Sequence, residues 1–80
     1  MPRLLFFAAA REAAGLGAMD VTATTVSEAI GEAVARLPDS FGMVLPSCRV
    51  WLNGEPTDGH ERCGEADEIA FIPPVSGGSL

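Results

Sequence analysis

The sequence predicts one small α+β domain in which a mixed sheet is covered on one face by one main helix. Three observations predict it: short apolar runs of strand length, a single amphipathic segment with helical spacing, and an Asn-Gly turn between strand-like segments. The 80 residues, 48% of them hydrophobic, suffice for one core. We therefore divide the chain into a folded domain over residues 1–74 and a tail over residues 75–80.

The amino-terminal part carries two strand candidates joined by a helical turn. The apolar run Leu4–Ala8 is too short for a helix and is typical of a strand covered on both faces. Residues 9–17 contain charged side chains and two glycines, which predicts a short helical turn ending at Gly15 or Gly17. Met19–Thr24 has the β-branched composition of a second strand.

The main helix is predicted to begin at Thr25-Val26-Ser27-Glu28. Threonine followed three residues later by glutamate forms a capping box, in which each side chain satisfies a free backbone N–H. Pro38 ends the helix because proline lacks the N–H that the next turn needs. The predicted apolar face consists of Val26, Ala29, Ile30, Ala33, Val34 and Leu37.

The second half of the chain predicts a hairpin and a last strand. Residues 39–47 lie between two prolines and are expected to form a connector at the edge of the core. Arg49–Leu52 alternates like a strand, and Asn53-Gly54 directly after it is a strong hairpin signal. Glu68–Ile72 is the last strand, and Pro73-Pro74 ends it because neither residue can donate a ladder hydrogen bond.

Strand alternation leaves an apolar set on the sheet face that has no helix. An exposed apolar patch with a tryptophan is typical of a protein interface. Two alternatives stay open: residues 39–47 fold over this face, or the register is shifted by one residue. The residues expected to face the helix are Leu4, Phe6, Val50, Leu52, Ile69 and Phe71. Those expected to point outward are Leu5, Phe7, Trp51, Ala70 and Ile72.

The charge balance disfavours nucleic acids and anionic membranes as partners. Eleven acidic residues, five arginines and no lysine give a net charge of −6, which repels phosphates and fits a basic groove on another protein. No apolar segment reaches the roughly 18 residues of a membrane span, so we expect a cytoplasmic protein. Two cysteines are too few for a four-thiolate site, and we expect no bound metal.

The tail Pro73-Pro74-Val75-Ser76-Gly77-Gly78 combines a stiff exit with a pair of residues that lack Cβ atoms. Prolines favour an extended course, and paired glycines let the backbone thread a narrow channel. The tail is therefore suited to delivery into a partner's active site, with a frayed linker as the alternative.

Read together, the two ends of the chain closely resemble the small subunit of molybdopterin synthase, a ubiquitin-like sulfur carrier. The matching segments are Phe6-Phe7-Ala8 followed by Arg11-Glu12 and Gly15, and the stretch from Asp67 to Gly78. The resemblance spans nearly the whole chain. It implies the β-grasp fold, which agrees with the predicted order of strands and helix.

The resemblance implies that Gly78, preceded by Gly77, carries the reactive carboxylate. In this family an ATP-dependent enzyme similar to the ubiquitin-activating enzyme adenylates that carboxylate, and sulfide displaces AMP to leave a thiocarboxylate. The large subunit of molybdopterin synthase then transfers the sulfur to a cyclic pyranopterin precursor of the molybdenum cofactor. The chain would thus act as a sulfur-donating cosubstrate and bind no cofactor itself, since ATP is used by the activating enzyme.

The resemblance also implies a partner interface that includes Phe7, Ile72 and the vicinity of Pro56. With the outward Trp51 and the tail exit, the expected interface consists of Phe7, Trp51, Ile72, Pro73, Pro74 and Val75. The alternative functions are a sulfur carrier for thiazole, cysteine or tRNA thiolation, and a ubiquitin-like modifier of lysines.

One departure concerns the end of the chain. Family carriers finish at the second glycine, whereas this sequence continues through Ser79-Leu80. We expect a peptidase to trim these residues or a cloning remnant to account for them; departure from the sulfur pathway is the third possibility.

Overall fold

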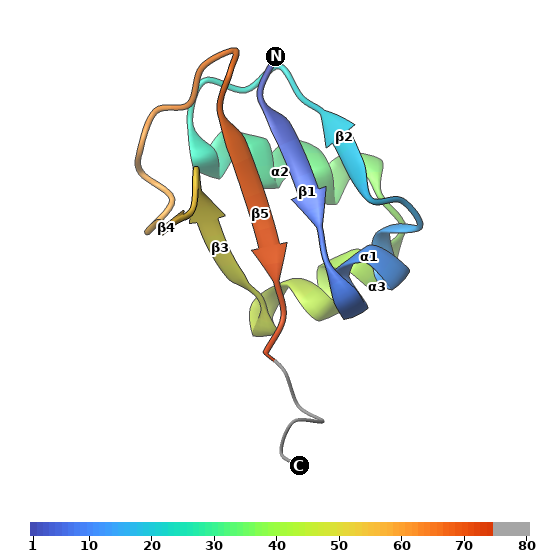
Figure 1. The fold of residues 1–80 in the computed structure, drawn as a ribbon. Helices are drawn as coiled ribbons and strands as arrows, with labels where there is room; N and C mark the ends of the chain where they lie inside the picture. The colour runs from blue at the N-terminus through green and yellow to red at the C-terminus, as the bar shows by residue number, and fades with distance from the viewer. Residues whose placement is uncertain (75–80) are drawn as a thin grey trace.

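The computed structural model describes residues 1–74, which form a five-stranded sheet with helices packed against it (Figure 1). The strands are β1 (Arg3–Phe6), β2 (Ala18–Asp20), β3 (Arg49–Leu52), β4 (Glu55–Pro56) and β5 (Glu68–Ile72). The helices are α1 (Ala8–Ala14), α2 (Val26–Arg36), α3 (Asp39–Val44) and the 3₁₀ turn η1 (Leu45–Ser47).

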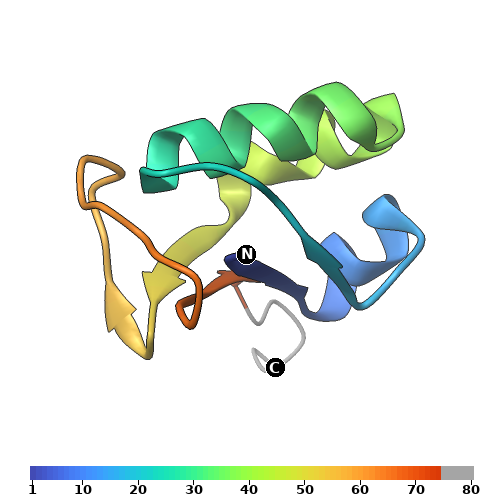
Figure 2. The same cartoon turned by 90° about the horizontal axis from the view of Figure 1, so that it is seen from above.

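The sheet is mixed, with strand order β2-β1-β5-β3-β4. β5 lies at its centre, parallel to β1 and antiparallel to β3. Figure 2 shows α2 and α3 on one side of the sheet, while no helix of residues 1–74 crosses the other side. This is the predicted α+β arrangement, with α2 as the main helix.

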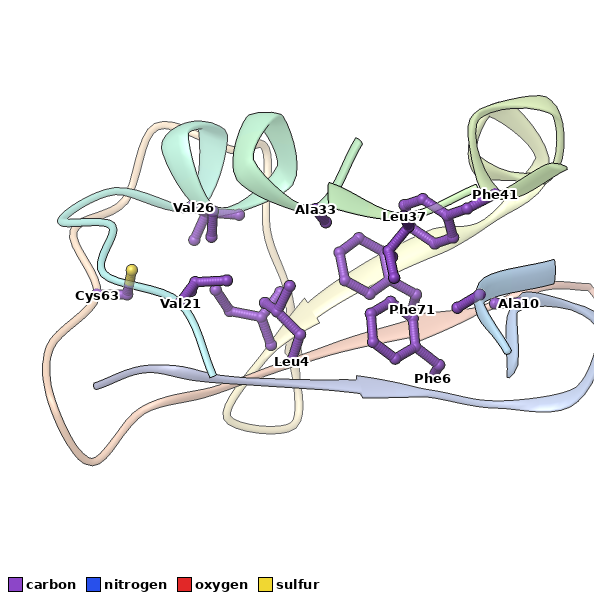
Figure 3. Close-up of a cluster of buried hydrophobic side chains, with 13 residues drawn as sticks. Leu4, Phe6, Ala10, Val21, Val26, Ala33, Leu37, Phe41, Cys63 and Phe71 are labelled. Atoms are coloured by element: carbon purple, nitrogen blue, oxygen red, sulfur yellow. The ribbon is translucent and has the colours of Figure 1, made fainter. Parts of the chain in front are cut away.

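The core lies between the sheet and the helices and is built around a cluster of three aromatic rings (Figure 3). Phe6 of β1 and Phe71 of β5 stack with ring centroids 5.3 Å apart, and Phe41 of α3 meets each edge-on at 5.4 Å. These are the offset and T-shaped geometries that aromatic quadrupoles favour. Leu4 and Ile69, two residues before the phenylalanines on the same strands, are fully buried beside them. The predicted inward alternation of β1 and β5 is therefore confirmed.

The start of α2 is capped much as predicted, with one difference. The Thr25 hydroxyl accepts a hydrogen bond from the Glu28 N–H at 3.1 Å. The Glu28 carboxylate reaches one residue further back than a capping box requires and accepts from the N–H and hydroxyl of Thr24 at 2.9 and 2.8 Å. These bonds, the Thr24 N–H foremost, lower the pKa of Glu28. Val34, predicted in the apolar face, is instead 46% exposed because it lies at the margin of the buried stripe.

Residues 39–47 are not the predicted connector. They form α3 and η1, and Phe41 of α3 is fully buried in the centre of the core. Since α3 packs on the same side of the sheet as α2, it leaves the opposite face open. The alternative in which this segment covers the outward apolar set is therefore wrong.

The first two strands are shorter than predicted. β1 ends at Phe6, because Ala8 adopts a left-handed φ of 50° and begins α1. β2 ends at Asp20 instead of continuing to Thr24, and the residues after it lead into the α2 cap. α1 closes at Gly15, as predicted, with φ of 80°.

The predicted hairpin is present between β3 and β4. Asn53 and Gly54 have φ of 51° and 86°, the paired positive values of a type I′ turn. The Asn53 side-chain amide donates to Asp67 at 2.9 Å, and its carbonyl oxygen accepts from the Glu68 N–H at 2.9 Å. The amide of Asn53, followed by the Gly64 N–H, lowers the pKa of Asp67. The turn is thereby tied to the start of β5, whose bounds match the prediction.

Candidate functional site

The sheet side away from α2, here called the open face, is apolar along its middle. Ala70 of β5 lies between its paired neighbours Leu5 of β1 and Trp51 of β3, and Trp51 is paired in turn with Pro56 of β4. Paired residues on neighbouring strands project to the same face. Leu5, Ala70 and Trp51 are half-buried. The middle of the open face is therefore a row of apolar side chains that water reaches.

The end of the open face nearest the tail carries the most exposed aromatic and aliphatic side chains of this surface. Phe7 follows the Phe6–Phe71 pair of the parallel strands, so it lies level with Ile72, and its N–H donates to the Phe71 carbonyl at 3.2 Å. Phe7 is 45% exposed and Ile72 is 38% exposed. Both were predicted from alternation to point outward. Together, Phe7 and Ile72 form an exposed apolar patch beside the end of β5.

A strained residue fixes the position of Phe7. Ala8 has φ of 50°, a conformation that costs a residue with a Cβ atom about 1–2 kcal/mol. This turn ends β1 and makes Phe7 the residue that caps α1, with extended φ and ψ of −122° and 150°. Backbone strain of this kind is concentrated at functional sites. The conformation holds the Phe7 ring outside the core and beside the tail exit.

The two prolines at the exit differ in burial. Pro73 is buried within the domain, whereas Pro74 is exposed. Buried Pro73 fixes the direction in which the chain leaves β5, and the partner contacts predicted for Pro73 and Pro74 stay predictions. Val75, Gly77 and Gly78 lie outside the described residues, and their predicted roles stay predictions.

The motif residues near the amino terminus line one shallow pocket, which the sequence did not reveal. Gly17 closes it beneath the Arg11 guanidinium, since a Cβ atom at this glycine would stand 3.5 Å from Arg11 Cζ. Ala8, the residue directly after Phe7, forms part of the pocket wall. Its lining consists of Ala8, Arg11, Glu12, Gly15, Leu16 and Gly17.

The thiols of the described domain are poorly suited to compete for an activated acyl group. Cys48 and Cys63 are both free. Burial raises the pKa of Cys48, and burial together with the charges of Asp67 and Glu28 raises the pKa of Cys63. The thiolate is the nucleophilic form, so a raised pKa keeps both groups unreactive at neutral pH.

Residues 1–74 contain neither a metal site nor a membrane-spanning helix. This part of the chain contains no group of three or more histidine, cysteine, aspartate or glutamate side chains placed to hold a metal ion. None of its helices has the length and apolar character needed to traverse a bilayer.

Comparison with known proteins places this geometry in a family. Residues 4–78 match the ThiS family, whereas no curated protein matches the chain. The crystal structure of small archaeal modifier protein 1 from Haloferax volcanii is 31% identical, with a TM-score of 0.81 over 96% of this chain and 98% of that one.

Two further solved structures share the fold at lower identity. A putative molybdopterin converting factor subunit 1 from Pyrococcus furiosus is 20% identical, with a TM-score of 0.80 over 92% of this chain and 97% of that one. A complex of subunits 1 and 2 of the molybdopterin-converting factor from Helicobacter pylori 26695 contains a chain that is 19% identical, with a TM-score of 0.73 over 92% of this chain and 93% of that one. The predicted β-grasp fold is confirmed, and the chain belongs to the ThiS family of ubiquitin-like sulfur carriers.

Proposed function

We propose that this chain is the sulfur carrier of molybdopterin synthesis, acting in the cytoplasm where ATP is available. Hydrolysis of the Gly78–Ser79 peptide bond first frees the carboxylate of Gly78. This carboxylate attacks the α-phosphorus of ATP in the active site of an adenylating enzyme, and pyrophosphate leaves. Sulfide then attacks the acyl carbon of the adenylate, and AMP departs with the electron pair. The thiocarboxylate of Gly78 donates its sulfur to a cyclic pyranopterin precursor held by the large subunit of molybdopterin synthase.

The observation that carries the proposal is the placement of an open apolar face beside the end of β5. Phe7 and Ile72 lie at that end, and the chain continues from them through Pro74 towards Gly77 and Gly78. A partner that covers this face meets the tail at the same edge. Docking of the body and insertion of the tail are therefore one event, which raises the local concentration of the reacting group.

Two features of the chain protect the activated group from side reactions. A carboxylate is a poor electrophile, but its mixed anhydride with AMP is attacked by amines and thiolates. The sequence contains no lysine, and burial keeps both thiols protonated. The activated acyl group is thus left for the sulfur donor.

The large subunit is the partner that we assign to the open face. The Helicobacter pylori structure is described as a complex of subunit 1 with subunit 2 of a molybdopterin-converting factor, and its matching chain has this fold. We propose the same kind of pairing here, with Phe7, Trp51 and Ile72 at the centre of the contact.

A second candidate function is a ubiquitin-like modifier, and a specific observation favours it. The relative from Haloferax volcanii, 31% identical over nearly the whole chain, is named a small archaeal modifier protein. The activation step would be the same, but the acyl group would pass to a lysine of a target protein. Carriers for thiazole, cysteine or tRNA thiolation share the thiocarboxylate and differ only in the acceptor.

The test compares the 80-residue chain with a version that ends at Gly78. Each is incubated with the adenylating enzyme from the same organism, ATP and sulfide, and its intact mass is measured. We expect exchange of one oxygen for one sulfur only in the version that ends at Gly78. The charged carrier is then added to the large subunit and the pyranopterin precursor. Return to the carboxylate mass with formation of the dithiolene product supports molybdopterin synthesis, whereas isopeptide adducts in place of thiocarboxylate would contradict it.

A further inference from the structure

The two ends of the open face carry opposite charges. At the end far from the tail, Arg3 is paired with Glu68 on one side and with Asp20 on the other. Arg3 Nε lies 3.3 Å from Asp20 Oδ1, so these two charges compensate each other and Glu68 remains as the net charge of that end. At the tail end, Ile72 is paired with Arg49 of β3. The apolar middle row therefore separates a negative end from a positive end.

Arg49 projects onto the open face and has no carboxylate partner within residues 1–74. Val50, the next residue of β3, packs against the core, so Arg49 and Trp51 point to the opposite side. The ion pairs of the described domain involve the amino terminus, Arg3 and Arg36. The exposed guanidinium of Arg49 thus forms no ion pair within residues 1–74, even though the chain has eleven acidic residues for its five arginines.

We propose that Arg49 is the docking determinant for the adenylating enzyme, where it pairs with a carboxylate at the edge of the enzyme's adenylation site. This inference rests on the proposed function, because it requires that the tail be activated. Activation is common to carriers and modifiers, so the inference does not depend on which acceptor follows. The enzyme must approach from the tail end, and Arg49 is the charged side chain of the row formed there with Phe7 and Ile72.

The charge pattern permits one docking orientation. A partner surface with a carboxylate opposite Arg49 and a basic group opposite Glu68 matches the face in only one direction. Rotating that partner surface by 180° in the plane of the open face would bring like charges together at both ends, which costs several kcal/mol at an interface. In the matching direction, the tail enters the enzyme and not the solvent.

The anion that Arg49 meets is expected to be a protein carboxylate and not a phosphate of ATP. Gly78, the residue that reacts with ATP, stands six positions after Ile72, whereas Arg49 is fixed in the sheet opposite Ile72. A guanidinium in the folded body therefore contacts the surface on which the body docks. Its planar fork of donors fits a carboxylate with two parallel hydrogen bonds, a geometry that lysine cannot reproduce.

The test measures ATP–pyrophosphate exchange by the adenylating enzyme from the same organism, with the version of this protein that ends at Gly78. Arg49→Glu is compared with Arg62→Glu, which changes the net charge equally but at an exposed position that pairs with Thr25 at the start of α2. We expect Arg49→Glu to raise the KM for this protein at least about tenfold, with kcat and the KM for ATP unchanged. Arg62→Glu should change this KM by no more than about twofold. Arg49→Lys should recover only part of the loss.

The outcomes distinguish failure of the docking proposal from failure of the proposed function. Equal effects of Arg49→Glu and Arg62→Glu would mean that total charge matters and would overturn the proposal, as would a raised KM for ATP. No exchange with the unsubstituted protein would overturn the proposed function itself. Thermal unfolding is measured for every variant. If Arg49→Glu is unfolded, Arg49→Gln removes the cation without adding a charge and must still raise the KM.

Discussion

Truncation of Phe7 to alanine is expected to weaken binding of the large subunit by up to about 2 kcal/mol. Phe7 is 45% exposed, which for a side chain of about 200 Å² leaves about 90 Å² that a partner can cover. At about 25 cal/mol per Å², burial of this area contributes roughly 2 kcal/mol, or about a 40-fold change in Kd. The fold should persist, because Phe7 is not part of the buried core cluster and the backbone of residue 7 is unchanged.

The assay is isothermal titration of the large subunit from the same organism with each variant. Met43→Ala is the matched control: Met43 is 82% exposed, more than Phe7, but it lies on α3 at the opposite side of the sheet. We expect Kd to rise about 30- to 40-fold for Phe7→Ala and to stay within about twofold for Met43→Ala. Equal Kd values for both variants, each folded by thermal unfolding, would refute the assignment of the open face as the docking surface.

Three further predictions concern stability and side reactions. Gly59→Ala should lower the free energy of unfolding by about 1–2 kcal/mol in urea denaturation, because Gly59 has φ of 96° and a Cβ atom would lie 3.2 Å from Ser27 Oγ. Gly64→Ala should change it little, because Gly64 has no positive φ and its Cβ atom would make only an ordinary contact with Asp67 Oδ2 at 3.9 Å. Folding lowers the pKa of Glu28 and Asp67, so their contribution is present at neutral pH and is lost as pH falls below the ordinary glutamate value of 4.5 and the aspartate value of 3.8. Urea midpoints should therefore drop in acid, and Glu28→Gln and Asp67→Asn should flatten that drop; an unchanged acid profile would contradict the hydrogen-bonding account. Because the chain has no lysine, adenylation without a sulfur donor should give no oligomers linked through side-chain amines, and any ladder on denaturing gels should be joined through the α-amino group of Met1; an isopeptide linkage found by peptide mapping would contradict this.

Local chemistry made several elements predictable from sequence. The Thr25 cap begins α2, the Asn53-Gly54 turn sets the hairpin, and Pro73 ends β5, each through a backbone requirement that few residue types satisfy. The residues of the open face could also be predicted from the sequence, because the alternation of side chains on β1, β3 and β5 assigns each residue to a face once the register is correct.

The missed features depend on tertiary contacts. α3 spans six residues, contains a glycine and shows no helical repeat, so its helix is stabilised by the burial of Phe41 against the stacked pair of Phe6 and Phe71. The left-handed turn at Ala8 cannot be inferred from an alanine, which ordinarily continues a strand or a helix. The burial of Pro73 also depends on the fold, because nothing in the sequence distinguishes it from the exposed Pro74.

The central claim is that the acyl group of Gly78 is loaded with sulfur and then unloaded on a pterin precursor. The most direct measurement is the intact mass of the version ending at Gly78, taken after activation and again after addition of the large subunit with the precursor. The account predicts a gain of one sulfur for one oxygen at the first step and its complete reversal, with dithiolene formation, at the second. A mass that never changes in the presence of a competent activating enzyme, or a thiocarboxylate that the large subunit leaves intact, would contradict it.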